Sequence, residues 1–284
     1  MLQQIFNAYK TSFTGLSRET WLLSCVILLN RCGYMAVPFM GLYVTQALHR
    51  PESDAGIIIS LFGVGSILGA AAGGKLTDVF GYRPVQILAS LIGGIFFLLF
   101  AMVEDFTWLC VLAVVISFFS EAFRPANYAA IASYAAEGTE TRSYSLNRLA
   151  NNIGWAFGIS MGGIIASYNY KLLFIVDGSV SVLVAFVIFF LLPAKKVQRK
   201  TAQEKREMKV RKPWNDVPYI KFMVLCAMFT TCAFLMFRVV PVFYKEVWHL
   251  DEALIGIILG INGVVIALVE MVMITKIENK RSPI

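Results

Sequence analysis

The sequence predicts an all-α membrane protein, a bundle of helices that crosses the bilayer eight times. Composition is the first reason, because 58% of the 284 residues are hydrophobic and only 15% are charged, whereas an average soluble domain carries about 25% charged residues. Length is the second reason, because the chain contains eight mostly apolar stretches of about 20 residues, the length of helix that a bilayer requires. These values exclude a disordered chain and a disulfide-stapled secreted domain, and they argue against a soluble enzyme.

The eight predicted spans follow a short N-terminal segment, residues 1–20. Apolar residues recur in that segment at helical spacing, which predicts an amphipathic helix at the membrane interface; they are Leu2, Ile5, Phe6, Tyr9, Phe13 and Leu16. The spans themselves are predicted, in chain order, at Trp21–Val44, Ala55–Leu76, Gln86–Val103, Thr107–Tyr134, Tyr144–Ala166, Leu172–Leu192, Tyr219–Tyr244 and Leu254–Thr275.

Lysine and arginine decide the predicted orientation. With the N-terminus in the cytoplasm, nineteen of the 25 basic residues lie in cytoplasmic segments, three lie on the opposite side and three lie within spans. This excess is the positive-inside pattern of multi-pass membrane proteins. It also explains the net charge of +7 without a nucleic-acid partner. We therefore expect a multi-pass protein of the cytoplasmic (inner) membrane, with the lipid bilayer as its surroundings.

Cysteine and histidine give no sign of metal or redox chemistry. The five cysteines fall in apolar stretches without a CxxC spacing, and the chain has only two histidines, both in predicted loops. The chain therefore offers too few histidines for a histidine-ligated metal site or a His-based catalytic triad. We expect no cofactor, no metal and no enzyme activity.

A basic segment divides the chain into two unequal parts. Residues 194–217 are densely charged and are expected to form a solvated cytoplasmic linker between a six-helix bundle over residues 21–193 and two more helices over residues 218–284. The later helices echo the first two, because Gly56 and Gly256 each open a span and each precede an acidic residue by 22 positions. Duplicated transporter folds leave such similarity between their halves, although two membrane hairpins can also look alike without a common origin.

The segment between the second and third predicted spans carries a family motif. It reads GKLTDVFGYR and resembles the signature loop of the major facilitator superfamily, with matches at Gly74, Leu76, Asp78, Gly81 and Arg83. The resemblance implies a transporter built from two six-helix halves. It also implies a gating role, in which Asp78 and Arg83 form an ion pair that makes and breaks as the halves rock. A loop held by an ordinary surface salt bridge is the alternative.

Glycines recur in the fifth predicted span at Gly154, Gly158, Gly162 and Gly163. This spacing resembles the antiporter motif of the drug:proton antiporter branch of the same superfamily, with Ile159 at the position of the motif's proline. The resemblance implies a protein similar to bacterial multidrug-efflux carriers. Small residues four apart also let helices approach closely, so a plain packing face is an equal alternative.

Charged residues inside spans are the candidate coupling and cavity residues. Arg31 lies about 15 Å into the first span, near mid-membrane, and Glu121 and Arg124 share one face of the fourth span. Because a charge at the bilayer centre costs about 2.5–3.5 kcal/mol, we expect the three to line a central cavity, with Glu121 as the proton carrier. A permanently paired structural cluster is the alternative. The remaining candidates are Asn127, Arg238 and Asp177, the last of which could instead act as a cap beside Lys171.

These features together predict a secondary active transporter, which exports small amphiphilic compounds or drugs by alternating access, is coupled to protons and acts as a monomer. A non-transporting sensor or scaffold on the same fold is one alternative, and a membrane-embedded enzyme is a weaker one. The chain stops at residues 280–283, where a second signature loop would begin. We therefore expect a chain that lacks four helices and does not transport alone.

Overall fold

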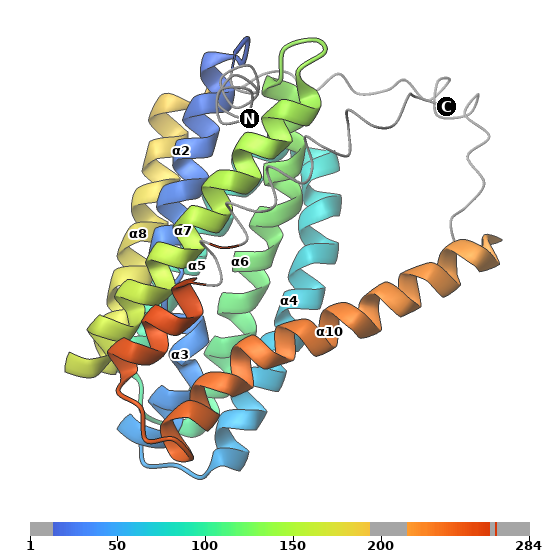
Figure 1. The fold of residues 1–284 in the computed structure, drawn as a ribbon. Helices are drawn as coiled ribbons and strands as arrows, with labels where there is room; N and C mark the ends of the chain where they lie inside the picture. Colours follow the sequence, from blue (N-terminus) through green and yellow to red (C-terminus); the bar gives the residue numbers. More distant parts are fainter. Residues whose placement is uncertain (1–13, 194–214, 262–264, 266–284) are drawn as a thin grey trace, which may run out of the picture.

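The structure, a computed structural model, describes residues 14–193, 215–261 and 265, and among these it describes no side chains for residues 233–238. The regular elements of the described residues are all helices, and the long helices between residues 18 and 191 lie side by side in an elongated bundle (Figure 1). Six are long and apolar enough to cross a membrane, which confirms the all-α fold and the first six predicted spans. The predicted interfacial helix and the basic linker lie mainly outside the described residues.

The helices extend beyond the predicted apolar cores by a few residues at most ends. The first span comprises α2 (Arg18–Gly33), α3 (Ala36–Leu42) and the short π-helix η1 (Tyr43–Ala47). The next five are α4 (Glu52–Phe80), α5 (Tyr82–Met102), α6 (Phe106–Tyr134), α7 (Glu140–Tyr168) and α8 (Tyr170–Leu191). After the linker come α10 (Val217–Glu246) and a helix over Glu252–Ile261. The end of the bundle at Gly81 is here the inner end, because it is predicted to face the cytoplasm, and the opposite end at Asn169 is the outer end.

Polar side chains cap the first turn of several helices. Ser17 accepts from the backbone N–H of Thr20 at 3.1 Å, and Asp105 accepts from that of Trp108 at 3.1 Å. Each cap satisfies one of the backbone donors that a helix start leaves open and contributes about 1 kcal/mol. The caps at Ser17 and Asp105 therefore place the starts of the first and fourth spans.

Glycines bring two pairs of helices into backbone contact. Gly65, Gly69 and Gly73 lie four residues apart on α4, and a Cβ at any of them would collide with the backbone of α6. On α7, Gly154 and Gly158 lie in the same way against the backbone of α2. Close approach of this kind gains van der Waals contact that larger residues prevent. It fixes α6 against α4 and α7 against α2, and α2, α6 and α7 are the helices that form the site.

The core has two apolar layers with a polar layer between them. In the outer half, the ring of Phe174 lies 4.9 Å from that of Tyr43 and 4.6 Å from that of Phe100, measured between centroids. In the inner half, Tyr82 packs edge-on against Tyr134 with centroids 5.4 Å apart. The middle layer between the two clusters contains the charged residues inside the first, fourth and sixth spans.

The helices after the linker contact the bundle at its outer end. Figure 1 shows α10 running obliquely across the six helices, with its first turns standing clear of them. Near its other end, Val242 packs beside Gly41 of α3. The amide of Gln46 donates to the Glu246 carboxylate at 2.7 Å, and the Tyr170 hydroxyl donates to that of Glu252, also at 2.7 Å. These contacts join the two parts of the chain.

Candidate functional site

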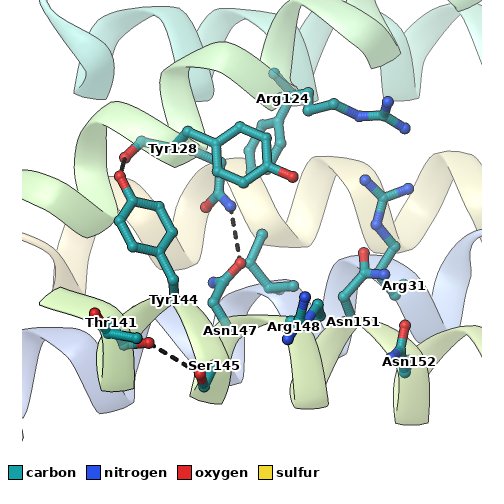
Figure 2. Close-up of a pocket in the computed structure, with 13 residues that line it drawn as sticks. Arg31, Arg124, Tyr128, Thr141, Tyr144, Ser145, Asn147, Arg148, Asn151 and Asn152 are labelled. Carbon is teal, nitrogen blue, oxygen red and sulfur yellow. Dashed lines mark hydrogen bonds between the residues drawn. The ribbon is translucent and has the colours of Figure 1, made fainter. Parts of the chain in front are cut away.

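A cavity of about 590 Å³ lies between α2, α6 and α7 in the inner half of the bundle (Figure 2). Its volume lies within the range of small-molecule sites in proteins. The lining is predominantly polar and consists of Arg31, Arg124, Arg148, Asn127, Asn147, Asn151, Asn152, Tyr128, Tyr144, Thr141 and Ser145, with Ile27 and Phe123 as its apolar members. A polar chamber of this size inside a membrane-spanning bundle can hold a water-soluble group away from the lipid.

One face of α7 supplies most of the polar wall. Thr141, Ser145, Arg148 and Asn152 are separated by four, three and four residues, which places them on a single helix face. Arg148 was not predicted as a cavity residue, because the charge count assigned it to the cytoplasmic side although it lies four residues inside the predicted span that begins at Tyr144. In the structure α7 begins at Glu140, so Arg148 lies within the helix and lines the cavity. The regular spacing of these polar residues is the signal that could have identified it.

The charged pair on α6 divides between the cavity and the space behind it. Arg124 Nε lies 3.3 Å from the Glu121 carboxylate, and the Arg124 side chain extends into the cavity (Figure 2). Glu121 is 16% exposed and does not line the cavity. Pro125 follows within the same helix, and because a proline has no N–H, it leaves the carbonyl of Glu121, four residues earlier, without its helical donor.

Arg31 lies in the last turn of α2, where a cation is favoured by the helix dipole. Its guanidinium carbon lies 5.2 Å from the centroid of the Tyr34 ring, a cation–π contact. Its Nε is buried and makes no hydrogen bond. Figure 2 shows the side chains of Arg31 and Arg124 extending into the same corner of the cavity. The structure thus brings together two of the three charges predicted to line a cavity, and places Glu121 behind one of them.

Asp177 occupies a break in the first span. The α2 helix ends at Gly33 and α3 begins at Ala36, and the carboxylate of Asp177 on α8 accepts from the backbone N–H of Ala36 at 3.1 Å. The side chain is 2% exposed. It does not contact Lys171, which pairs with Glu104 at 2.6 Å in the outer loop; this hydrogen bond and the charge of the ammonium lower the pKa of Glu104. Asp177 therefore caps a helix of a different span, deep in the bundle.

Amide side chains connect the cavity to the bundle behind it. Asn127 Nδ2 donates to Asn147 Oδ1 at 3.2 Å, and Gln86 Nε2 donates to Asn127 Oδ1 at 3.5 Å. These bonds link α5, α6 and α7 across the floor of the cavity. The Nδ2 atom of Asn147 is buried and has no hydrogen-bond partner.

The signature segment differs from the predicted loop. The α4 helix continues through Gly74 and Asp78 to Phe80, and Gly81 alone makes the turn into α5. Its φ of 89° and ψ of 163° are accessible almost only to glycine. The expected pair of Asp78 and Arg83 is not formed in this conformation, because Arg83 donates to the carbonyl of Phe189 on α8 at 2.6 Å.

The antiporter-like glycines pack against both parts of the chain. Gly154 and Gly158 contact α2, and a Cβ at Gly162 would lie 2.9 Å from that of Met35. Gly163 faces the helix over residues 252–261, where an added Cβ would lie 2.8 Å from the Cα of Gly256. The four glycines thus lie on a closely packed face of α7. The last candidate, Arg238, lies in α10, but its side chain is outside the described residues.

The structure shows no metal-binding arrangement in the part of the chain that it describes, since no group of three His, Cys, Asp or Glu side chains converges there. Fold and site together define a polytopic helical membrane protein with a polar chamber inside its bundle. Residues 22–284 match the sequence profile of the Major Facilitator Superfamily, and the chain belongs to this family.

Curated relatives share the family and extend further than the matched segments. An uncharacterised MFS-type transporter of Bacillus subtilis, YttB, is 28% identical over 159 residues, 54% of this chain and 38% of the relative. The class D tetracycline resistance protein of Salmonella ordonez is 26% identical over 164 residues, 56% of this chain and 41% of the relative. A transporter of Mycobacterium tuberculosis, MT0872, is 24% identical over 237 residues, 80% of this chain and 54% of the relative. The matches thus span between 38% and 54% of the length of these relatives. The family and the names of the two MFS-type transporters among them indicate a transporter rather than an enzyme.

Proposed function

We propose that this protein is a secondary active transporter that exports small amphiphilic compounds by alternating access and is driven by the proton gradient. The polar cavity between α2, α6 and α7 is the observation that carries this proposal. Membership of the superfamily supports transport, and the tetracycline resistance protein among the relatives supports a drug-like substrate. The antiporter-like glycines of α7 favour exchange against protons.

The contacts at the outer end suggest how access would alternate. We define the outer seam as Gln46, Tyr170, Lys245, Glu246 and Glu252, which hydrogen-bond or ion-pair with one another, including Lys245 to Glu252 at 2.9 Å. With the seam closed, the cavity exchanges its contents through the inner end. Breaking the seam while the inner end closes would expose the cavity to the other side.

Glu121 is the proposed proton carrier. Its carboxylate holds Arg124 only while it is ionised, so protonation removes the ion pair and releases a guanidinium that already extends into the cavity. Releasing Arg124 changes the charge that a bound compound meets. Proton binding and substrate binding are therefore coupled through one side chain, which is a requirement for proton-driven transport.

Reconstitution tests this function. The protein is placed in liposomes, and uptake of a fluorescent amphiphilic dye is followed under an imposed proton gradient. We expect gradient-driven flux that a protonophore abolishes and that Glu121→Gln uncouples, while Glu137→Gln, an exposed carboxylate in the inner loop, leaves it unchanged. Full proton-driven transport by E121Q would overturn the carrier role. Absence of both flux and proton coupling in the unmodified protein would favour the sensor or scaffold alternative.

A further inference from the structure

The charges that line the cavity are all of one sign. Three of its lining residues are arginines, Arg31, Arg124 and Arg148, and none of the lining residues in the described part of the chain is Asp or Glu. The two nearest carboxylates are already engaged. Glu121 pairs with Arg124 from behind the wall, and Asp177 caps α3. Glu121 offsets the charge of Arg124, whereas Arg31 has no ion pair among the described residues, and a charge held within a membrane is costly unless it finds a counter-charge.

Two residues of the cavity lining also carry buried N–H donors that lack an acceptor. Two buried polar atoms of the lining have no hydrogen-bond partner, and they are Arg31 Nε and Asn147 Nδ2. Both are N–H donors. A buried donor without an acceptor costs about 1–3 kcal/mol. Because neither atom is exposed to the cavity, an acceptor reaches it only when the side chain of Arg31 or Asn147 turns toward the ligand.

Aromatic residues form the adjoining wall. Tyr128 and Tyr144 lie with ring centroids 6.2 Å apart, and the hydroxyl of Tyr144 donates to the Tyr128 carbonyl at 3.2 Å. Figure 2 shows this pair on one side of the cavity and the side chains of Arg31 and Arg124 on the other. The apolar residues Ile27 and Phe123 complete the lining. An apolar or aromatic ligand body fits beside the tyrosines while its charged end reaches the arginines.

We infer that the cavity selects amphiphiles that carry an anionic group, a carboxylate, sulfonate or phosphate, which binds Arg31 and Arg124 at one end of the site while the ligand body lies against Tyr128 and Tyr144. This inference rests on the proposed function and names its substrate class. Guanidinium groups suit these anions because each presents several donors in a planar fork. Arg148 adds positive charge on the α7 wall.

Three probes with one ring system test the inference. The 284-residue chain in an uncharged detergent is titrated with 1-naphthoate, 1-naphthylmethanol and 1-naphthylmethylammonium, and the dissociation constants are measured by calorimetry. We expect the anion to bind about tenfold or more tightly than the alcohol, and the cation to bind more weakly than the alcohol. Equal affinities, or tighter binding of the cation, would overturn the inference. This comparison uses the unmodified chain and does not depend on the folding of any variant.

Variants locate the binding site. Arg31→Gln and Arg124→Gln are each expected to weaken 1-naphthoate binding about tenfold, with partial recovery in Arg124→Lys. Arg142→Gln is the matched control, because Arg142 lies on α7 outside the cavity and donates to the Thr14 carbonyl at 3.4 Å; it should leave the affinity unchanged. Unaltered anion binding in both cavity variants would show that the arginines do not hold it.

Nanodiscs separate a soluble anion from a lipid headgroup. If 1-naphthoate binds in phosphatidylcholine nanodiscs and is displaced when phosphatidylglycerol is added, the anion site stands and its occupant is a lipid phosphate. If binding is the same in both, the occupant is a soluble organic anion. Failure of the proposed function is distinguishable, because anion binding without proton-driven flux contradicts transport alone, whereas proton-driven flux of a cationic dye without anion binding contradicts this inference alone.

Discussion

The carboxylate of Asp177 on α8 accepts from the backbone N–H of Ala36 at 3.1 Å, so a side chain of the sixth span holds the break in the first. The break leaves α3 with backbone donors that no residue of α2 can satisfy. Because the site is buried, water does not replace the carboxylate. This contact therefore contributes to fixing the start of α3, from which the chain continues to the outer seam.

Replacing Asp177 therefore tests the cap. We expect Asp177→Ala to destabilise the protein by about 1–3 kcal/mol, because it leaves the Ala36 N–H buried without an acceptor. Asp177→Asn keeps an acceptor oxygen and should cost less. Thermal unfolding in detergent, followed by circular dichroism, compares the two. An equal loss in both variants would show that the charge, rather than the hydrogen bond, is what α3 requires.

Replacing two glycines of the family motifs by alanine should change the stability of the protein in opposite directions. A Cβ at Gly158 would lie 2.6 Å from the backbone carbonyl oxygen of Arg31, and a backbone cannot move aside as a side chain can. Gly158→Ala is expected to cost about 1–3 kcal/mol as α2 and α7 separate. Gly74 lies in a helix with open space around it, so Gly74→Ala should stabilise by about 0.5–1 kcal/mol. Unfolding midpoints measure both, and a neutral Gly158→Ala would contradict the close helix contact.

The hydrogen-bonded amides of Gln86, Asn127 and Asn147 predict a difference in stability between two asparagine variants. Asn127→Ala removes the hydrogen-bond partner of both Gln86 and Asn147, and we expect a loss of about 1–3 kcal/mol. The control is Asn151→Ala, because Asn151 also lines the cavity but has no hydrogen bond that the structure records among the described residues. Chemical unfolding of the two variants gives the comparison. Equal stability would indicate that these amides do not hold α5, α6 and α7 together.

The sequence predicted the helices of this fold better than it predicted the walls of its cavity. The length of an apolar stretch indicates the part of a helix that lies in the bilayer, so the first six spans could be predicted. The cost of placing a charge within the membrane identified Arg31 and Arg124 as cavity residues. Arg148 was not identified, because it lies near the inner end of the predicted fifth span and was counted with the cytoplasmic charges. The break at α3 was missed for a different reason. Its acceptor, Asp177, lies 141 residues further along the chain, and the sequence around Ala36 does not indicate a contact over that separation.

The signature segment shows a similar limit. The family resemblance and the predicted end of the second span at Leu76 indicated a loop, yet the helix continues to Phe80 and only Gly81 turns. Glycine lowers helix propensity by about 1 kcal/mol, which the backbone hydrogen bonds of the surrounding helix outweigh at Gly74. Only the positive φ at Gly81 uses the conformational freedom that the residue offers.

The central claim is that the cavity opens alternately to the two sides of the membrane, and accessibility of one cavity position tests it most directly. In a variant with the five native cysteines replaced by serine, Asn151→Cys is labelled by a membrane-impermeant maleimide in sealed vesicles of each orientation. The account predicts fast labelling from the inner side. Opening the outer seam with Gln46→Ala and Glu252→Gln should speed labelling from the outer side and slow it from the inner side. Glu104→Gln, which removes an outer ion pair within the bundle, should change neither rate. Labelling rates that do not respond to the seam variants would contradict alternating access through this cavity.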